Sequence, residues 1–184
     1  MPIPKSTGFT GCALDAGLLH LSVAGVLDPA RWIELERVLA DFVTLRRRPN
    51  RLHAVLIDLR GATMDPCLTA EFLVEQMRMA DPARYRPRTI LLPAPAPQNN
   101  AGGGRGVYPY SMPIWTEVAS RAARAGRIVS VFIDPSLALV HAKERAAAQR
   151  AILIEAVRRK PTVARAAAAA VQPARLNRRA DPAP

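Results

Sequence analysis

Hydrophobic and polar residues alternate along this chain in two patterns, one typical of strands and one typical of helices. Leu19, Leu21 and Val23 alternate with polar positions, which is the pattern of a strand with one buried face. The preceding run, 8–15, also has strand character, and a short turn that contains Gly17 joins the two runs. The sequence therefore predicts that the folded part of the chain begins with a β-hairpin.

The spacing becomes helical after Asp28 and Pro29, which suit the cap and the first position of a helix. The apolar stripe of this helix is formed by Trp32, Leu35, Leu39, Phe42 and Val43. Three further helices are predicted, over 67–80, 114–126 and 135–160, and Pro161 is expected to end the last of them. The buried stripe predicted for this last helix is Leu137, Val140, Ala147, Ala151 and Ile154.

Between the helices lie short runs that are apolar almost throughout, as in strands that are covered on both faces. These runs are 54–61, 88–94 and 128–134. The element order is therefore β-β-α-β-α-β-α-β-α. It predicts an α/β fold, a mixed sheet of about five strands with helices packed against it. The run 54–60 is predicted to be the central strand, so that the turn after it faces outward as a contact surface.

The remaining segments are predicted to lie outside the regular elements. Residues 1–8 are expected to be a flexible lead, and 159–184 a disordered basic tail of Ala, Arg and Pro. The segment 93–113 is a loop rich in Pro, Gly and Asn, and a loop of this length inside a domain is uncommon. One α/β domain is thus predicted over 9–158.

The net charge of +11 and the pI of about 11.1 suggest nucleic-acid binding, but the distribution of charge weakens that interpretation. Nearly all basic residues are arginine, as in proteins of GC-rich bacterial genomes. About half of the excess positive charge lies from Arg158 onward. The chain shows neither a signal peptide nor an apolar run long enough to span a bilayer, so a cytoplasmic location is expected. Cys12 and Cys67 form no metal-binding or disulfide pattern.

Three stretches, in this order, resemble the STAS domain, the fold of the anti-sigma-factor antagonists and their SpoIIAA-like relatives. They are VAGVLD at 23–28, LIDLRGATMD at 56–65 and VSVFIDPSLALVHAKER at 129–145. They are similar to the family's first strand-to-helix junction, its core strand with the loop that follows, and its last strand and helix. The resemblance covers 9–158 and implies a regulatory domain that binds a partner protein.

The resemblance also implies where a phosphorylated hydroxyl would lie. Family members that act as phospho-switches carry Ser or Thr just after an Asp, at the start of the second helix. Asp65 of this chain fits that Asp, but Cys67 occupies the place of the hydroxyl residue and the usual Gly is absent. Thr69 is the nearest hydroxyl and is expected to lie inside the first helical turn. We therefore expect no phosphorylation at this loop.

Catalytic chemistry finds little support in the sequence. Cys67, His53 and Asp58 are the only conceivable thiol set, and nothing places His53 beside Cys67. The run GGGRG at 102–106 lacks the residues of a phosphate-binding loop and is interpreted as a mobile loop. The chain is therefore expected not to be an enzyme, and to hold no cofactor and no metal.

The leading hypothesis is a non-catalytic regulatory or scaffold domain that binds another protein. Its predicted contact residues are Thr63, Asp65, Cys67 and Thr69, with a second candidate surface at Arg105, Tyr108 and Tyr110. One alternative is association with nucleic acid through the basic tail. The other is a small acidic or lipid-like ligand held between sheet and helices. The sequence leaves the oligomeric state open.

Overall fold

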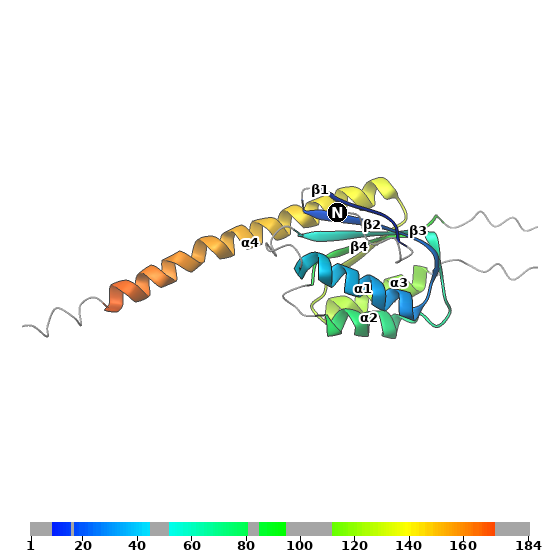
Figure 1. Cartoon of the computed structure of the whole chain (residues 1–184), viewed down its shortest axis with the longest axis horizontal. Coiled ribbons are helices and arrows are strands. Elements are labelled where there is room, and N and C mark those ends of the chain that lie inside the picture. The colour runs from blue at the N-terminus through cyan, green and yellow to red at the C-terminus, as the bar shows by residue number, and fades with distance from the viewer. Residues whose placement is uncertain (1–8, 16, 45–51, 81–84, 95–111, 172–184) are drawn as a thin grey trace, which may run out of the picture. The chain divides into compact units, whose positions relative to one another are not determined.

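The computed structural model describes residues 9–15, 17–44, 52–80, 85–94 and 112–171, and its elements follow the predicted order (Figure 1). The strands are β1 (Phe9–Asp15), β2 (Leu18–Leu27), β3 (Ala54–Met64), β4 (Arg88–Leu91) and β5 (Val129–Phe132). The helices are α1 (Pro29–Thr44), α2 (Ala70–Met79), α3 (Met112–Arg124) and α4 (Pro135–Val171). The chain divides into a body, 1–147, and a C-terminal unit, 148–184.

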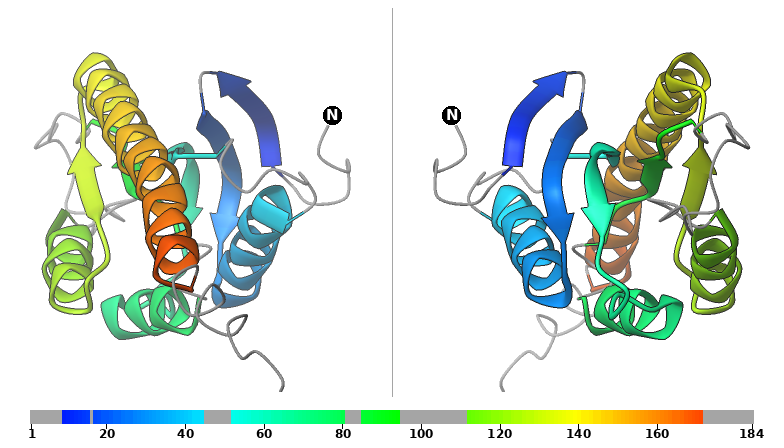
Figure 2. Two further views of the ribbon diagram at one scale, coloured as in Figure 1. Left: turned by 90° about the vertical axis from the view of Figure 1, so that its left-hand side faces the viewer. Right: turned by 90° about the vertical axis from the view of Figure 1, so that its right-hand side faces the viewer.

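The five strands form one sheet in the order β1-β2-β3-β4-β5. β1 is antiparallel to β2, and each later strand is parallel to its neighbour. Every crossover thus moves one strand further in the same direction, and right-handed crossovers of this kind place their helices on the same face. Figure 2 shows α1, α2 and α3 on one face of the sheet and the first turns of α4 on the other.

β3 is the central strand, and its side chains enter two hydrophobic cores. Val55, Ile57 and Leu59 face the larger core, which the sheet forms with α1, α2 and α3. Ala54 and Leu56 face the smaller core beneath α4. The prediction of a central strand that is buried on both faces is confirmed. In the larger core, Trp32 of α1 and Trp115 of α3 have ring centroids 5.8 Å apart.

The predicted hairpin and the predicted start of the first helix are also confirmed. Gly17 lies in the turn between β1 and β2 with φ of 87°, a conformation that glycine adopts without steric cost. The Oδ1 atom of Asp28 accepts a hydrogen bond of 2.7 Å from the backbone N–H of Arg31. Asp28 therefore caps α1, and the predicted stripe of α1 packs into the larger core.

The buried stripe predicted for the last helix is wrong. Leu137, Val140 and Ile154 are exposed, as are Ala147 and Ala151. The residues of α4 that pack on the sheet are Ala138, Ala142 and Ala146, spaced four apart. Short side chains let the helix backbone approach the sheet closely, so the small residues face inward and the larger ones remain outside.

Several helix boundaries also differ from the prediction, and two of them have a clear physical reason. α4 continues through Pro161 to Val171, and so includes residues 159–171 of the tail that the sequence predicts to be disordered. A proline inside a helix removes one backbone hydrogen bond, and the alanine-rich run after it consists of the strongest helix formers. α2 begins at Ala70 rather than at 67, because Thr69 caps it.

Several predictions fall outside the described residues. They concern the lead 1–8, the end of the tail at 172–184 and the loop candidates, which are Arg105, Tyr108 and Tyr110. Among the described helices, none has the length and apolar character that crossing a bilayer requires.

Candidate functional site

The two longest strands run on beyond their neighbour at one end of the sheet. β4 ends at Leu91, which lies opposite Asp58, whereas β3 continues to Met64 and remains paired with β2. We call the paired segments 24–27 and 61–64 the β2–β3 extension. It leads directly to the turn that the sequence predicts to be a contact surface. The carboxyl ends of parallel strands are the usual place for binding sites in sheets of this kind.

A β-bulge determines which side chains of the extension face outward. Ser22 pairs with Asp58, but the next registered pair is Ala24 with Gly61, so β3 carries one additional residue at this point. Beyond the bulge Ala62 is buried in the larger core, while Gly61 and Thr63 are exposed. Val26 lies opposite Thr63 and is 56% exposed. Bulges re-aim side chains and are frequent beside functional sites.

The turn after β3 is held by its own backbone and by the side chain of Asp65. The N–H of Asp65 donates to the carbonyl of Leu27, 3.0 Å away, which ties the turn to the end of β2. Oδ1 of Asp65 accepts from the N–H of Cys67 at 2.7 Å, and the carbonyl of Asp65 accepts from Leu68. The side chain of Leu68 is buried and anchors the turn to the core. The turn is thus an ordered feature of the surface.

Thr69 lies at the N-cap of α2 and not inside its first turn. Its Oγ1 accepts a hydrogen bond of 3.2 Å from the N–H of Phe72. This correction follows from the preference of Thr for the cap, where its oxygen satisfies an N–H that the helix leaves free. Thr63, Cys67 and Thr69 are exposed and Asp65 is half-buried, and the four residues follow one another along one short path at the surface. We call this path the β3–α2 tip.

The chemistry of the tip does not suit a nucleophile. Cys67 is exposed, and its hydrogen bond to Asp65, the Asp65 charge and a small effect of burial raise the pKa of its thiol. His53 is buried just before β3 begins, where its N–H donates to the carbonyl of Gly17. The length of β3 separates it from Cys67 by roughly 30 Å. The thiol set considered from the sequence is therefore not assembled.

Beside the extension, Asp58 and Arg60 form an ion pair on the outer face of the sheet. Nη2 of Arg60 lies 2.7 Å from Oδ2 of Asp58, and both Nε and the backbone N–H of Arg60 lie 3.0 Å from Oδ1. Burial alone would raise the pKa of Asp58, but the bonds to Arg60 and the charges of Arg60 and His20 lower it. Nε2 of His20 lies 3.8 Å from Oδ2 of Asp58.

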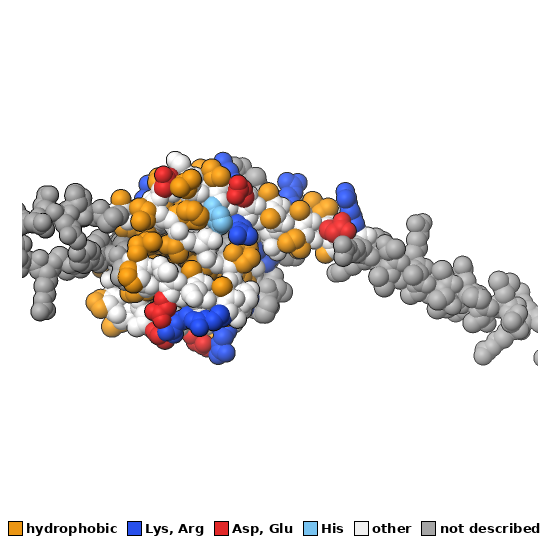
Figure 3. All heavy atoms as spheres, turned by 180° about the vertical axis from the view of Figure 1, so that it is seen from behind, with side chains coloured by type: hydrophobic (Ala, Val, Ile, Leu, Met, Phe, Trp, Pro, Cys, Tyr) orange, Lys and Arg blue, Asp and Glu red, His pale blue; other side chains and the backbone are white. Residues whose placement is uncertain are grey.

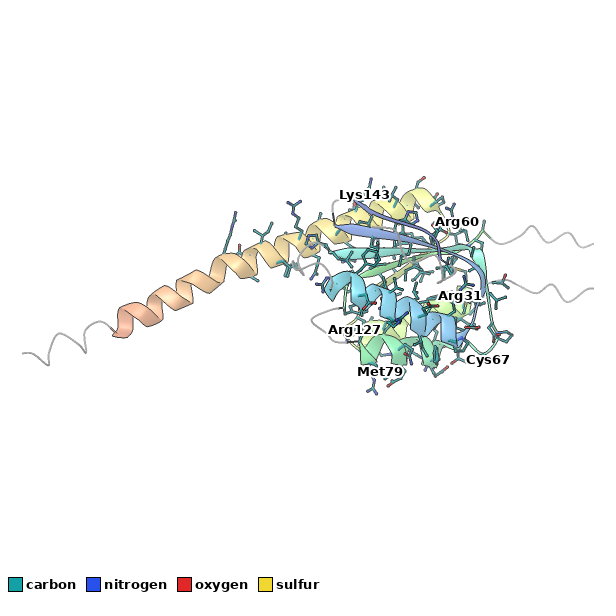
Figure 4. All side chains as sticks on the ribbon, in the orientation of Figure 1. Arg31, Arg60, Cys67, Met79, Arg127 and Lys143 are labelled. Atoms are coloured by element: carbon teal, nitrogen blue, oxygen red, sulfur yellow. The ribbon has the colours of Figure 1, made fainter. Side chains whose placement is uncertain are left out.

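This pair borders a hollow of about 300 Å³. Its walls are formed by Ser22, Val23, Ala24, Asp58, Arg60 and Gly61. Figure 4 shows that Arg60 lies at the same end of the body as Cys67, whereas Met79 lies at the far end of α2. The described residues contain no group of His, Cys, Asp and Glu side chains that could hold a metal ion.

A second hollow, of about 120 Å³, lies at the opposite end of the strands, between α1, the start of β3 and the segment before β4. Its polar side chains already have partners. Nη2 of Arg88 lies 2.6 Å from Oε2 of Glu36, and Nε of Arg86 donates to the carbonyl of Leu52 at 2.7 Å. Ordinary ligand pockets have volumes of about 300–1,000 Å³. This space offers little support for the small-ligand alternative.

The surface of α2 and α3 differs from the tip. Figure 3 shows acidic and basic side chains gathered along the lower edge of the face seen from behind. Here Arg78 pairs with Glu75, and Arg121 pairs with both Glu71 and Glu117. These charges satisfy one another, and this surface supplies control positions for the experiments below.

Sequence reasoning missed Asp58, Arg60 and Val26 as parts of the candidate site. The signal for the first two was present, since Asp and Arg two residues apart in an apolar strand share a face. The exposure of Val26 depends on the bulge, which the sequence pattern did not show.

Comparison with known proteins adds little to this picture. No family model and no curated protein matches the sequence. Among solved structures, one described as "Crystal Structure Analysis of Mglu" is similar over 50% of this chain, with 15% sequence identity and a TM-score of 0.31. The match covers 21% of that chain, so the present chain spans only a small part of its length. A similarity at this level carries no functional inference.

Proposed function

We propose that this chain is a STAS-like regulatory or scaffold domain that binds a partner protein through the β3–α2 tip. The observation that carries the proposal is the exposed and internally bonded turn at the end of the central strand. A surface that is ordered before binding loses less conformational entropy when it docks. The exposed Val26 beside Thr63 adds apolar area to the same surface.

The sheet and the three resembling stretches support the family part of the proposal. The strands are consecutive in space, with one antiparallel hairpin strand at the edge. The stretch 23–28 ends at the cap of α1, 56–65 ends in the tip, and 129–145 includes the cap of α4 at Asp134. The first and third stretches thus contain a strand-to-helix junction, and the second contains the core strand and the start of the loop after it, as the resemblance implies.

The proposed domain acts without a phospho-switch at the tip. Cys67 replaces the hydroxyl that a kinase would modify, and the Thr69 hydroxyl is engaged as the cap of α2. We therefore expect binding that depends on the shape and charge of the tip rather than on its phosphorylation.

The test is affinity capture from native cells followed by reconstitution with the purified partner. The full chain, Asp65→Lys and Thr63→Arg are compared, because the second variant blocks the surface and leaves the Asp65 hydrogen bonds in place. Glu75→Lys on α2 is the matched control. The proposal predicts a protein that the wild type and the control capture, and for which both tip variants bind at least about tenfold more weakly. Unchanged binding by both tip variants would contradict it.

Nucleic-acid association remains a second candidate, supported by the charge of the end of the chain. From Arg158 onward there are seven basic residues and one acidic residue, and α4 continues as a helix through Val171. Binding through these residues should weaken steeply with salt and disappear when 158–184 are deleted. Fluorescence anisotropy with a short duplex tests this candidate, and equal binding by the truncated chain would exclude the basic tail as the cause.

A further inference from the structure

We propose that the hollow beside Arg60 receives an acidic side chain from an extended segment of the partner protein. The proposal rests on the proposed function, because it names the chemistry of the partner that docks at the tip. The hollow adjoins the β2–β3 extension, so a segment that contacts the tip would continue across it.

Arg60 is held in place and still has hydrogen bonds to give. Asp58 engages Nε and Nη2, the inner edge of the guanidinium. Nη1 makes no hydrogen bond with the described residues, and the Arg60 side chain is 48% exposed. An arginine presents five N–H donors in a rigid fork, so a second carboxylate can bind at the outer edge while Asp58 holds the inner one. Because Asp58 already orders the side chain, the partner would not have to do so.

The hydrogen bonds that Asp58 already accepts determine whether the hollow binds a cation or an anion. Both carboxylate oxygens of Asp58 accept hydrogen bonds from Arg60, and its side chain is only 9% exposed. Asp58 therefore does not attract a cation, while the outer edge of Arg60 offers donors to an anion. The two oxygens of a carboxylate can each accept a hydrogen bond from the outer edge of the Arg60 guanidinium, as in bidentate Arg–carboxylate pairs. An Asp or Glu side chain of a polypeptide segment is therefore the anion that we assign to the hollow, and inorganic phosphate is the competing anion in the test below.

The small side chains around Arg60 allow a polypeptide backbone to approach the sheet. Ser22, Ala24 and Gly61 border the hollow, and Gly61 is exposed. Val26 and Thr63 follow on the same outer face beyond the bulge. A segment that lies along this face would place its acidic side chain at Arg60. Its next side chain that points toward the sheet would be apolar and would contact Val26.

The direct test uses a short peptide as the probe and the full chain as the receptor. An acetylated and amidated peptide in which Val stands two residues after Glu, so that both side chains lie on one side of an extended segment, is titrated into isotope-labelled protein. Amide and arginine Nε–H signals are recorded by NMR. We expect saturable shifts at Arg60, Gly61 and Ala24. Replacing Glu by Gln in the peptide should weaken binding by about tenfold.

Variants distinguish a binding role of Arg60 from a merely structural one. Arg60→Gln leaves Asp58 without its cation, so the double variant Asp58→Asn/Arg60→Gln is used beside it to keep the pair neutral. Both should lose the peptide response. The control is Arg78→Gln, which removes an exposed arginine paired to a nearby carboxylate on α2 and should leave the response unchanged.

The outcomes separate this inference from the proposed function. If Asp65→Lys abolishes capture of the partner but the double variant binds it normally, the tip is the docking site and the assignment of Arg60 is wrong. Equal shifts with the Glu and Gln peptides, or tighter binding of inorganic phosphate than of the Glu peptide, would also overturn it. Two results together support it. The double variant no longer binds the partner, and the wild-type chain responds to the Glu peptide but not to the Gln peptide.

Discussion

At the scale of single residues, the buried ion pair between Arg88 and Glu36 should matter most for stability. The Arg88 side chain is almost fully buried and lies over the ring of Tyr85, and Glu36 is its counter-charge. Glu36→Gln leaves the guanidinium buried without compensation, which is expected to cost about 3–5 kcal/mol in urea unfolding. Glu75→Gln, at the exposed pair with Arg78, is the control and should cost less than about 1 kcal/mol. Similar losses in both variants would contradict the assignment.

The thiol of Cys67 gives a second prediction at this scale. Its hydrogen bond to Asp65 and the Asp65 charge raise the pKa, so less thiolate is present at a given pH than in an ordinary exposed cysteine. Asp65→Asn removes the negative charge and lowers the pKa. Alkylation of Cys67 by iodoacetamide near neutral pH should therefore become faster, measured in a Cys12→Ser background. A slower or unchanged rate would show that Asp65 does not control the thiol.

The sequence identified the residues of the tip but not their roles. The order Thr63, Asp65, Cys67, Thr69 after an apolar strand was enough to locate an outward turn. It could not show that Asp65 bonds Cys67 or that Thr69 caps α2, because these contacts depend on where the helix begins. Asp58 and Arg60 were missed as a site although their spacing of two in a strand places them on one face, whereas the exposure of Val26 depends on the bulge, which the sequence does not show.

At the scale of elements, the N-cap of α2 links the tip to the helix. Thr69→Ala removes the oxygen that accepts from Phe72 and should lower the free energy of unfolding by about 1 kcal/mol. Thr69→Ser keeps an oxygen at the same place and should cost much less. Chemical denaturation of the three proteins measures the difference. Equal stability of the alanine and serine variants would mean that the cap contributes nothing.

The packing of α4 gives a prediction that separates the observed stripe from the one expected from the sequence. Ala142 lies fully buried against the sheet, whereas Val140 is 55% exposed. Ala142→Leu forces a larger side chain into this contact and should cost about 1–3 kcal/mol. Val140→Ala should change the stability by no more than about 0.5 kcal/mol. The reverse order of effects in thermal or urea unfolding would favour the predicted stripe.

The error in α4 has a physical cause that hydrophobicity alone could not reveal. Leu137 and Val140 are more hydrophobic than Ala138 and Ala142, so a sequence pattern places them inside. The separation between helix and sheet decides which residues of α4 face inward. Where the two backbones lie close together, alanine side chains fit and larger side chains do not. In the shorter helix α1, by contrast, the predicted apolar stripe does pack into the larger core.

At the scale of the whole molecule, the sequence predicts that β3 is central, because its apolar run suits a strand covered on both faces, and the order β1-β2-β3-β4-β5 confirms this. The full strand order was not predicted, since a hairpin followed by alternating helices and strands is compatible with more than one order. The identity of a partner could not be derived. Recognition of a partner depends on the shape and charge of the surface. The sequence shows which residues form that surface but not how they are arranged.

The most direct test of the tip as a docking surface is site-specific photo-crosslinking in native cells. A photoreactive amino acid is placed at Thr63 in the tip or, as a control, at Met79, which is 71% exposed at the far end of α2. The account predicts a discrete crosslinked protein from position 63 and none from position 79, with the product lost on adding Asp65→Lys. Crosslinking from 79 alone, or from 63 regardless of Asp65→Lys, would contradict it.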